Sequence, residues 1–248
     1  MKKFEMPKYL MGKPVSDWLK EDSKSPEQKQ EPRKITLPSN IDLDKYIQIP
    51  KSKIIIAREE TLKGKTWGET HTELAKQNLF MPEIPTFLSH FLNVKEAYEG
   101  KTKLYLASGK ELGKTEVEDL YKYLTIDHRS GCWTWLDAYF KDKAGEMHIL
   151  TRNKTIDNKI DAPIMKDCFV GLSFNVQGMP TQESSNQKYV QGKNIKYYYP
   201  RKDCVARFYA VSDWAILNCG RNPTNSYSAL GVFACAEGAS AQNSGDKK

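Results

Sequence analysis

The stretch that decides the fold is VARFYAVSDWAILNCGRNPTNSYSALGVFACA, residues 205–236. From Phe208 to Trp214 one set of alternate positions is suited to packing, and after Trp214 that set shifts by one residue, to Ala215, Leu217 and Cys219. Alternation with a period of two predicts strands with two distinct faces. A shift of one residue predicts a turn or a bulge between two strands.

The rest of this stretch predicts a turn and a closing strand, over Arg221–Ser226 and Ala229–Ala234. From Asp203 to Ala236, 34 residues contain no Lys, Glu, Gln or Met, although these four types supply 64 of the 248 residues. Buried strands explain part of this gap, but ordinary surface elsewhere in the chain is rich in Lys and Glu. The gap suggests that one face of the strands has a special purpose.

Working outward, the sequence from residue 131 onward contains short aromatic or β-branched segments separated by Gly, Asn, Asp and Pro, which predict strands. These segments are GCWTWLDAYF, EMHILTRN, CFVGLSFNV, NIKYYYP and CVARFYAV. Helical patterns come before them, over Thr66–Phe80 and from Pro85 to Gly100, and a capping-box pattern at Thr115–Glu118 predicts a third helix. Two short strands are expected near residues 41–50 and at Lys53–Ala57. This order predicts an α+β fold with a mostly antiparallel sheet.

The domain limits follow from composition. Residues 1–40 are charged and contain prolines, which predicts a flexible or loosely docked extension, and residues 237–248 predict a disordered tail. The folded domain is expected over residues 41–236, with a variable region at about 203–234. The chain has no apolar run long enough to span a membrane and no apolar core of a secretory signal, so we expect a soluble protein. Whether it sits on a virion, on a cell surface or in the cytoplasm stays open.

Motifs for common chemistry are missing from the sequence, so we expect no enzyme activity, no cofactor and no metal. The four histidines are far apart, and Asp137 and Asp142 are interpreted as solvated surface residues. The five cysteines form no CxxC and predict buried free thiols, although one bridge among Cys204, Cys219 and Cys235 is permitted. An oxidase-like enzyme that uses these three cysteines is a third possible class.

The segment KNIKYYYPRK, residues 193–202, offers an alternative function. Aromatic residues interleaved with positive charge can stack bases and hold phosphates, and the formal net charge is +7. The lysines are scattered over the whole length, however, which favours a role in solubility. A plain strand with tyrosines on both faces is the simpler interpretation, and nucleic-acid binding is kept as the alternative.

The pattern VARF-x-A-x-S-x-x-A-x-L-x-C, followed by NP and then SALGV, resembles the variable region of the target proteins of diversity-generating retroelements. The similarity is to the group from archaeal viruses and from small-genome archaea and bacteria. CWTWLDAYF, MHILTRNK and KYYYPRKD also resemble that group, so the resemblance covers roughly residues 70–236. It implies a C-type-lectin-like fold of the subtype similar to formylglycine-generating enzymes.

The resemblance also implies which residues vary. The retroelement rewrites adenines, chiefly in AAC-type codons, which can then encode many residues but never Lys, Glu, Gln, Met or Trp. Trp214 would therefore be a fixed framework residue. The implied variable, ligand-binding positions are Tyr209, Val211, Asp213, Ile216, Asn218, Gly220, Asn222, Thr224, Asn225 and Tyr227, with Asp203 as a further addition. The implied framework positions are Arg207, Phe208, Ala210, Ser212, Trp214, Ala215, Leu217, Cys219, Pro223, Leu230 and Gly231.

The implied function is recognition of changing partners, which are unknown protein or cell-surface ligands. Each varied side chain is expected to face solvent, because a substitution there neither opens a cavity nor buries a polar group. Two family features are missing. Asn222-Pro223-Thr224 lacks the carboxylate of the calcium–sugar motif, and the late cysteines do not reproduce the paired-cysteine active site of the related enzymes.

Overall fold

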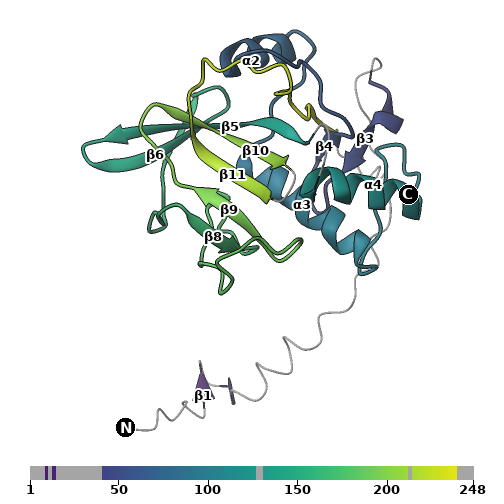
Figure 1. Ribbon diagram of the computed structural model, residues 1–248. Helices are drawn as coiled ribbons and strands as arrows, with labels where there is room; N and C mark the ends of the chain where they lie inside the picture. The colour runs from purple at the N-terminus through teal and green to yellow at the C-terminus, as the bar shows by residue number, and fades with distance from the viewer. Residues whose placement is uncertain (1–8, 11–12, 15–40, 127–130, 212–213, 239–248) are drawn as a thin grey trace, which may run out of the picture. The chain divides into compact units, whose positions relative to one another are not determined.

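The computed structural model describes residues 9–10, 13–14, 41–126, 131–211 and 214–238 (Figure 1). The chain divides into two units, residues 1–31 and 32–248. In the first unit, β1 (Tyr9–Leu10) pairs antiparallel with β2 (Lys13–Pro14). The remainder of the extension predicted over residues 1–40 lies outside the described residues, as does most of the tail predicted over 237–248.

The second unit is built around a seven-stranded sheet. Its strands are β5 (Trp133–Lys143), β6 (Glu146–Thr151), β7 (Ile156–Lys159), β8 (Cys168–Gly171), β9 (Asn194–Tyr198), β10 (Cys204–Val211) and β11 (Trp214–Arg221). The order across the sheet is β7-β6-β5-β10-β11-β9-β8, and every neighbouring pair is antiparallel except β11 with β9. The prediction of an α+β fold with a mostly antiparallel sheet is therefore confirmed.

A smaller sheet joins the two ends of the domain. After a short 3-10 helix, η1 (Leu43–Lys45), it comprises β3 (Tyr46–Gln48), β4 (Ile54–Ala57) and β12 (Cys235–Glu237), in the order β12-β4-β3. The closing strand was predicted too early, at 229–234, because residues there make only single bridges, Val232 with Thr61 and Gly231 with Thr134. Glu237 pairs with Ile54, so the expectation that it begins a disordered tail is wrong.

Three helices appear where helices were expected: α2 (Trp67–Ala75), α3 (Ile84–Tyr98) and α4 (Lys114–Thr125). The first ends earlier than predicted, because Asn78 adopts a positive φ of 55° and Phe80 bridges to Cys235. The predicted cap of the third was misplaced, since Glu116 Oε2 accepts a hydrogen bond from Gly113 N at 2.9 Å and Thr115 lies inside the helix. Among the described residues, no helix has the length and apolar character needed to cross a membrane.

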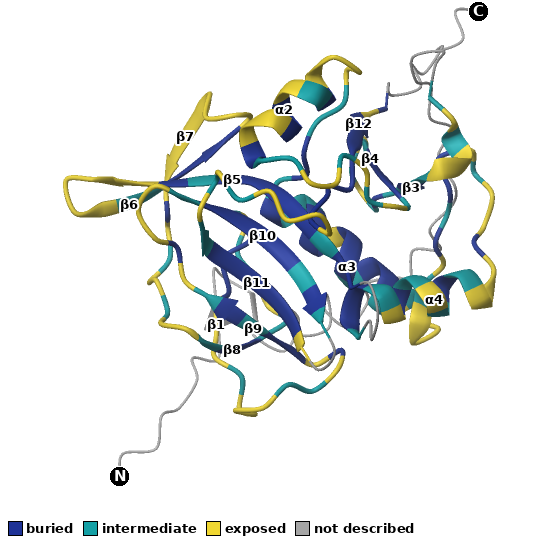
Figure 2. Ribbon diagram, turned by 45° about the horizontal axis from the view of Figure 1, so that its top comes forward, coloured by how far each residue is buried: buried dark blue, intermediate teal, exposed yellow. Residues whose placement is uncertain are grey.

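The main core lies between the seven-stranded sheet and the helices α3 and α4 (Figure 2). Phe87 and Phe91 of α3 pack on Phe208 of β10, with ring centroids 4.9 and 5.5 Å apart. A second cluster includes Trp67 of α2 and Trp135 of β5, together with Val205, Leu230 and Val232. Both faces of β5 are therefore covered as far as Phe140, one by α3 and the other by α2 and residues 230–234, while residues 141–143 are exposed.

Candidate ligand-binding face

The hairpin β10–β11 carries most of the positions that the sequence singled out. Its register pairs Phe208 with Leu217 and Ala210 with Ala215, and all four residues have no exposed surface. Cys219 is equally buried. These side chains belong to the main core, which is the side of the sheet covered by α3 and α4. We call this side the inner face and the opposite side of β10, β11 and β9 the outer face.

The outer face carries the other alternate positions of the hairpin. Here Tyr209 pairs with Ile216 and Val211 pairs with Trp214, which leaves residues 212–213 as the connection between the strands. Tyr209, Val211 and Gly220 are half-buried. Asp213 and Ser212, predicted to be a variable and a framework position, lie outside the described residues.

Trp214 is on the face opposite to the one expected. The prediction groups Trp214 with Phe208, because it places the one-residue shift in alternation after Trp214. The register shows that the shift lies before Trp214, between Val211 and Trp214. Trp214 is 40% exposed and its ring centroid lies 5.6 Å from that of Phe169 on β8. A fixed Trp214 would therefore be a permanent part of the outer face and not of the core.

Two of the predicted variable residues do not face solvent. Ile216 is 4% exposed and Asn218 is 6% exposed, so the expectation of full solvent access is wrong for both. They lie in the middle of the sheet beside the parallel strand β9, where their partners are Lys196 and Tyr198. Asn218 uses its amide oxygen to accept a hydrogen bond from Gly220 N at 3.0 Å. These two positions form the floor of the outer face.

The loop after β11 holds the remaining candidates. Asn222, Thr224 and Tyr227 are exposed and Asn225 is half-buried. Asn222 Oδ1 accepts hydrogen bonds from Thr224 N at 2.9 Å and from Thr224 Oγ1 at 2.8 Å, so these two candidates support each other. The loop is attached to the domain at Pro223, whose carbonyl accepts from Trp67 N at 3.1 Å.

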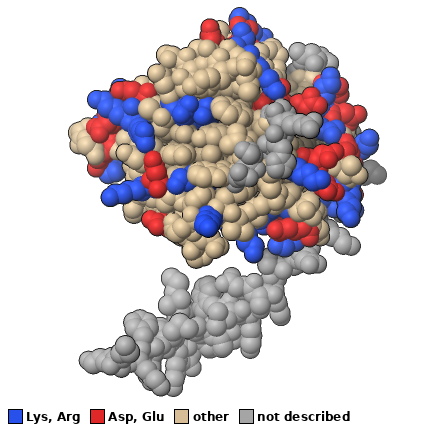
Figure 3. All heavy atoms as spheres, in the orientation of Figure 1, with Lys and Arg blue, Asp and Glu red and all other residues tan. Residues whose placement is uncertain are grey.

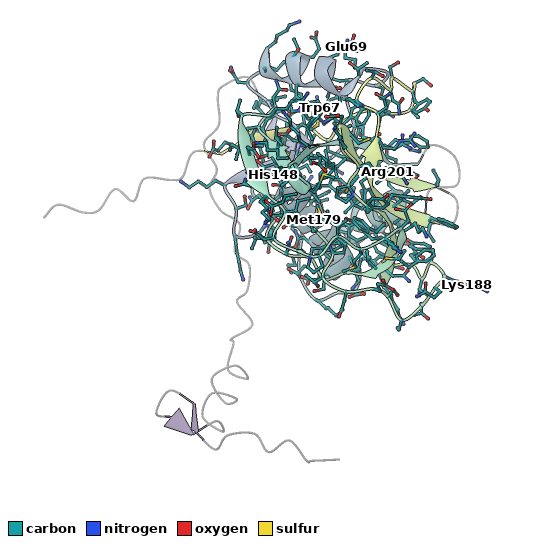
Figure 4. All side chains as sticks on the ribbon, turned by 90° about the vertical axis from the view of Figure 1, so that its left-hand side faces the viewer. Trp67, Glu69, His148, Met179, Lys188 and Arg201 are labelled. Carbon is teal, nitrogen blue, oxygen red and sulfur yellow. The ribbon has the colours of Figure 1, made fainter. Side chains whose placement is uncertain are left out.

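α2 covers the end of the outer face near β5. Trp67 lies on the inner side of this helix, while Glu69 points away from the domain (Figure 4). Trp67 Nε1 donates to Leu136 O at 3.0 Å, and Trp135 Nε1 donates to Lys65 O at 3.0 Å. The open part of the face is therefore the part over β10, β11 and β9. Figure 3 shows this part in the middle of the view, where uncharged residues prevail and most charged atoms lie toward the edges.

Two glycines of the region have opposite surroundings. A Cβ on Gly231, a predicted framework position, would lie 2.7 Å from the carbonyl oxygen of Thr61. A Cβ on Gly220, a predicted variable position, would meet only the side chain of Arg201, at 3.1 Å, and that side chain is half exposed. Backbone cannot move away as easily as a flexible side chain, so the contacts agree with a fixed Gly231 and a replaceable Gly220.

The basic segment 193–202 runs along the same sheet. Tyr197 is 1% exposed and belongs to the core, whereas Tyr198 is half-buried and Tyr199 is 37% exposed. Arg201 pairs with Asp167 at 3.3 Å, and Lys196 lies 4.9 Å from the ring centroid of Phe169. One of the three tyrosines is thus unable to stack on a base, and nucleic-acid binding through the others stays a hypothesis.

Asp137 is a buried structural residue, contrary to its interpretation as a solvated one. It is 2% exposed, accepts from Arg152 N at 2.8 Å, and lies 3.2 Å from Nε2 of the buried His71. His90 is also buried, and desolvation lowers its pKa to about 4. Among the described residues, no group of three or more His, Cys, Asp or Glu side chains is arranged to hold a metal ion.

Cys204, Cys219 and Cys235 are free thiols, so the permitted bridge among them is not formed. Burial raises the pKa of Cys219 and of Cys235, which keeps both thiols protonated. A thiol must be ionised to act as a nucleophile or a metal ligand. These two side chains therefore act as apolar core residues.

Arg207, a predicted framework position, lies on the outer face, which the sequence pattern starting at Phe208 does not indicate. Its side chain lies among the rings of Trp133, Tyr209 and Tyr227. The alternation that begins at Phe208 would have placed Arg207 with Tyr209 if it had been extended back by one residue. Trp133 carried no such signal, because its strand, β5, is distant in sequence.

The fold class of the described domain is α+β. The candidate face rests on the register of β10, β11 and β9 and on the burial of their side chains. Comparisons of the chain with protein-family models, with curated proteins and with solved structures each gave no match.

Proposed function

We propose that this protein binds ligands through the outer face and that a diversity-generating retroelement rewrites this face to recognise changing protein or cell-surface partners. The domain would be C-type-lectin-like, of the subtype similar to formylglycine-generating enzymes, and would have no enzymatic role. One observation supports the proposal most: candidate variable residues occupy one face of β10 and β11, while the intervening residues are fully buried on the other.

The physical properties of the face suit recognition. Binding energy at protein surfaces comes from few residues, often aromatic, and Tyr and Asn supply contact area or adaptable hydrogen bonds. Tyr209 and Tyr227 are such aromatic candidates, and Asn222 and Asn225 are such polar ones. Tyr209 lies on β10, which pairs with a strand on both sides, so little backbone conformational entropy is lost when a ligand binds there.

Deep sequencing of this gene from its source population tests the proposal. We expect substitutions to concentrate at Tyr209, Val211, Gly220, Asn222 and Tyr227, since these side chains are at least partly exposed. Ile216 and Asn218 should vary within a narrower range of size and polarity, because they are buried.

The control lies in the same hairpin. Phe208, Ala210, Leu217 and Cys219 use the same strands and have no exposed surface, so they should stay constant. Substitutions spread evenly over inner and outer positions, or along the whole gene, would contradict diversification of this face.

A further inference from the structure

Arg207 lies at the centre of an aromatic cluster on the outer face. The carbon of its guanidinium is 4.7 Å from the ring centroid of Trp133, 4.4 Å from that of Tyr209 and 5.9 Å from that of Tyr227. The residue is only 3% exposed. Tyr227 is 50% exposed, whereas Tyr209 and Trp133 are half-buried, so Tyr227 is the most exposed of the three aromatic residues.

The charge of Arg207 has no counterion among the described residues. Arg58, Arg152 and Arg201 each pair with a carboxylate, whereas Arg207 and Arg221 pair with none. Nε and Nη1 of Arg207 are buried without a hydrogen-bond acceptor in the described part of the chain, and so is Nε of Arg221. Two neighbouring arginines therefore present unsatisfied donors at the same face.

The guanidinium remains charged in spite of this environment. Burial, followed by the nearby charge of Arg221, lowers the pKa of Arg207 to about 10, which is still well above neutral pH. A buried charge without a partner is costly, because water no longer solvates it. The stacking on three rings offsets part of that cost. An anion would offset more, since hydrogen bonds between ionised partners are among the strongest in proteins.

We infer that Arg207, supported by Arg221, forms an anion-binding subsite at the buried centre of its aromatic cluster on the outer face and that it takes the carboxylate of an acidic side chain on a protein ligand. This inference rests on the proposed function and names the ligand chemistry that the face prefers. The carboxylate enters from the Tyr227 side and accepts hydrogen bonds from guanidinium donors. Trp133, Tyr209 and Tyr227 form the apolar walls around it.

The arrangement favours a single inserted carboxylate over a nucleic-acid backbone. Proteins that bind single strands use an exposed positive groove that follows many phosphates. Here the unpaired cation is recessed among rings, while the neighbouring Arg201 is neutralised by Asp167 and Lys196 lies over the rings of Phe169 and Tyr198. The buried unpaired charge of this face thus lies at Arg207, with Arg221 beside it.

The subsite combines fixed and changeable parts. Arg207 belongs to the predicted framework and Trp133 lies outside the variable region, whereas Tyr209 and Tyr227 are predicted to vary. Every variant would therefore keep the charged centre and the Trp133 wall and change the other two walls. Ligands of different shape would share one property, an acidic group placed at the centre of the contact.

The first test observes the wild-type protein directly by NMR, so it does not depend on a variant that folds poorly. The Nε–H signal of Arg207 is followed while sodium acetate replaces sodium chloride at constant ionic strength. We expect a saturable shift with a dissociation constant on the order of millimolar, and no comparable shift at Arg201. An unchanged Arg207 signal, both in the wild type and in a Tyr227→Ala variant with a more open approach, would overturn the inference.

Variants then assign the effect to the guanidinium. Acetate binding is followed in them at the indole N–H signal of Trp133, whose ring lies 4.7 Å from the Arg207 guanidinium and is kept in every variant. Arg207→Lys keeps the charge but loses the planar donors, and we expect acetate binding to weaken about tenfold or more. Arg201→Lys is the matched control on the same face and should leave acetate binding unchanged. If Arg207→Lys and Arg201→Lys weaken acetate binding equally, acetate responds to the general surface charge, and the assignment of the subsite to Arg207 is wrong.

The source of the anion is tested with two probes of equal charge, a glutamate-rich peptide and a thymidine oligonucleotide. We expect the peptide to shift the Arg207 signal at lower concentration, and tighter, steeply salt-dependent oligonucleotide binding would overturn the assignment to a protein ligand. Failure here is distinguishable from failure of the proposed function. If the gene is diversified but Arg207 does not respond to anions, only the anion subsite is rejected. If Arg207 responds to anions but the gene is not diversified, the subsite stands and the proposal of a diversified face is rejected.

Discussion

The two faces of the β10–β11 hairpin have the same backbone and different surroundings. On the inner face, Phe208 and Leu217 pair across the strands with no exposed surface, packed beneath α3. On the outer face, the next pair, Tyr209 and Ile216, lies against Trp133, Arg207 and β9. One residue of sequence therefore separates a position fixed by core packing from one that contacts a surface cluster.

The comparison also shows that outward orientation and exposure are different properties. Ile216 and Asn218 point to the outer face and are nevertheless buried, because β9 and its side chains flank them. The face consequently has a buried floor with exposed residues around it. We call the exposed positions around this floor, such as Asn222 and Tyr227, the rim. A substitution in the floor would change the shape of the face, while a substitution in the rim would change its direct contacts with a ligand.

The sharpest test of the comparison replaces neighbours on opposite faces. We expect Phe208→Ala to lower the free energy of unfolding by about 3–5 kcal/mol, because it leaves a cavity against Phe87 and Phe91. Tyr209→Ala should cost only about 1 kcal/mol, since it loses a partly exposed aromatic contact. Urea denaturation measures both, and equal losses would remove the distinction between the faces.

A second prediction concerns Glu60, whose buried carboxylate accepts from Trp133 N at 2.7 Å and so holds one wall of the outer face. Desolvation raises its pKa to about 7 from an ordinary value of 4.5. The folded state then binds more protons than the unfolded state between these values, so wild-type stability falls as the pH rises from 4.5 through 7. The free energy of unfolding should fall by about 3 kcal/mol in total across this pH range.

Glu60→Gln should abolish that loss, because the amide does not titrate and still accepts from Trp133 N. Chemical denaturation at pH 5 and pH 8 gives the difference in the free energy of unfolding between variant and wild type at each pH. The exposed neighbour Glu59 provides the control, Glu59→Gln, for which this difference should be the same at both pH values. If the difference in the free energy of unfolding between Glu60→Gln and the wild type does not change with pH, burial of this carboxylate has no energetic consequence.

The two glycines refine the comparison at the level of single atoms. Gly231→Ala should cost about 1–3 kcal/mol, because the new methyl group meets the Thr61 carbonyl oxygen at 2.7 Å. Gly220→Ala should change stability by less than about 0.5 kcal/mol, since the exposed side chain of Arg201 can move aside. Thermal unfolding compares the two, and a large loss for Gly220→Ala would exclude it as a freely varied position.

The smallest expected effects separate the floor from the rim. Asn218→Ala should cost about 1 kcal/mol, because it removes the side-chain acceptor of the half-buried Gly220 N–H. Tyr227→Ser, at the exposed rim, should stay within about 0.5 kcal/mol. If Tyr227→Ser is the more damaging of the two, the stacking around Arg207 contributes more to folding than the floor does.

Local patterns predicted the elements of this fold better than their limits. Phe87, Phe91 and Val94 share a buried helix face as their spacing indicates, and the strand ending at Ala57 starts within one residue of its expected position. The early end of α2 and the late start of β12 escaped prediction for one shared reason. Phe80 and Cys235 bridge each other, and that contact links positions far apart in the sequence.

The candidate face was predictable only in part, again because of long-range pairing. Alternation in a single strand indicates which residues share a face, and Tyr209 and Val211 follow it. It does not show that β9 lies parallel beside β11 and buries Ile216 and Asn218. Nor does it show that Trp133, from a distant strand, stacks on Arg207.

The last strand, β12, pairs with β4, so the chain completes its small sheet with residues that are synthesised after the whole candidate variable region. Contacts between such distant residues form slowly, and during synthesis this sheet has to wait for residue 237. Under the proposed diversification, each version of the outer face would therefore be made before the domain could close around it. Versions that prevent closure would leave strand edges unpaired and open to degradation, which would remove unfoldable variants before they could meet a ligand.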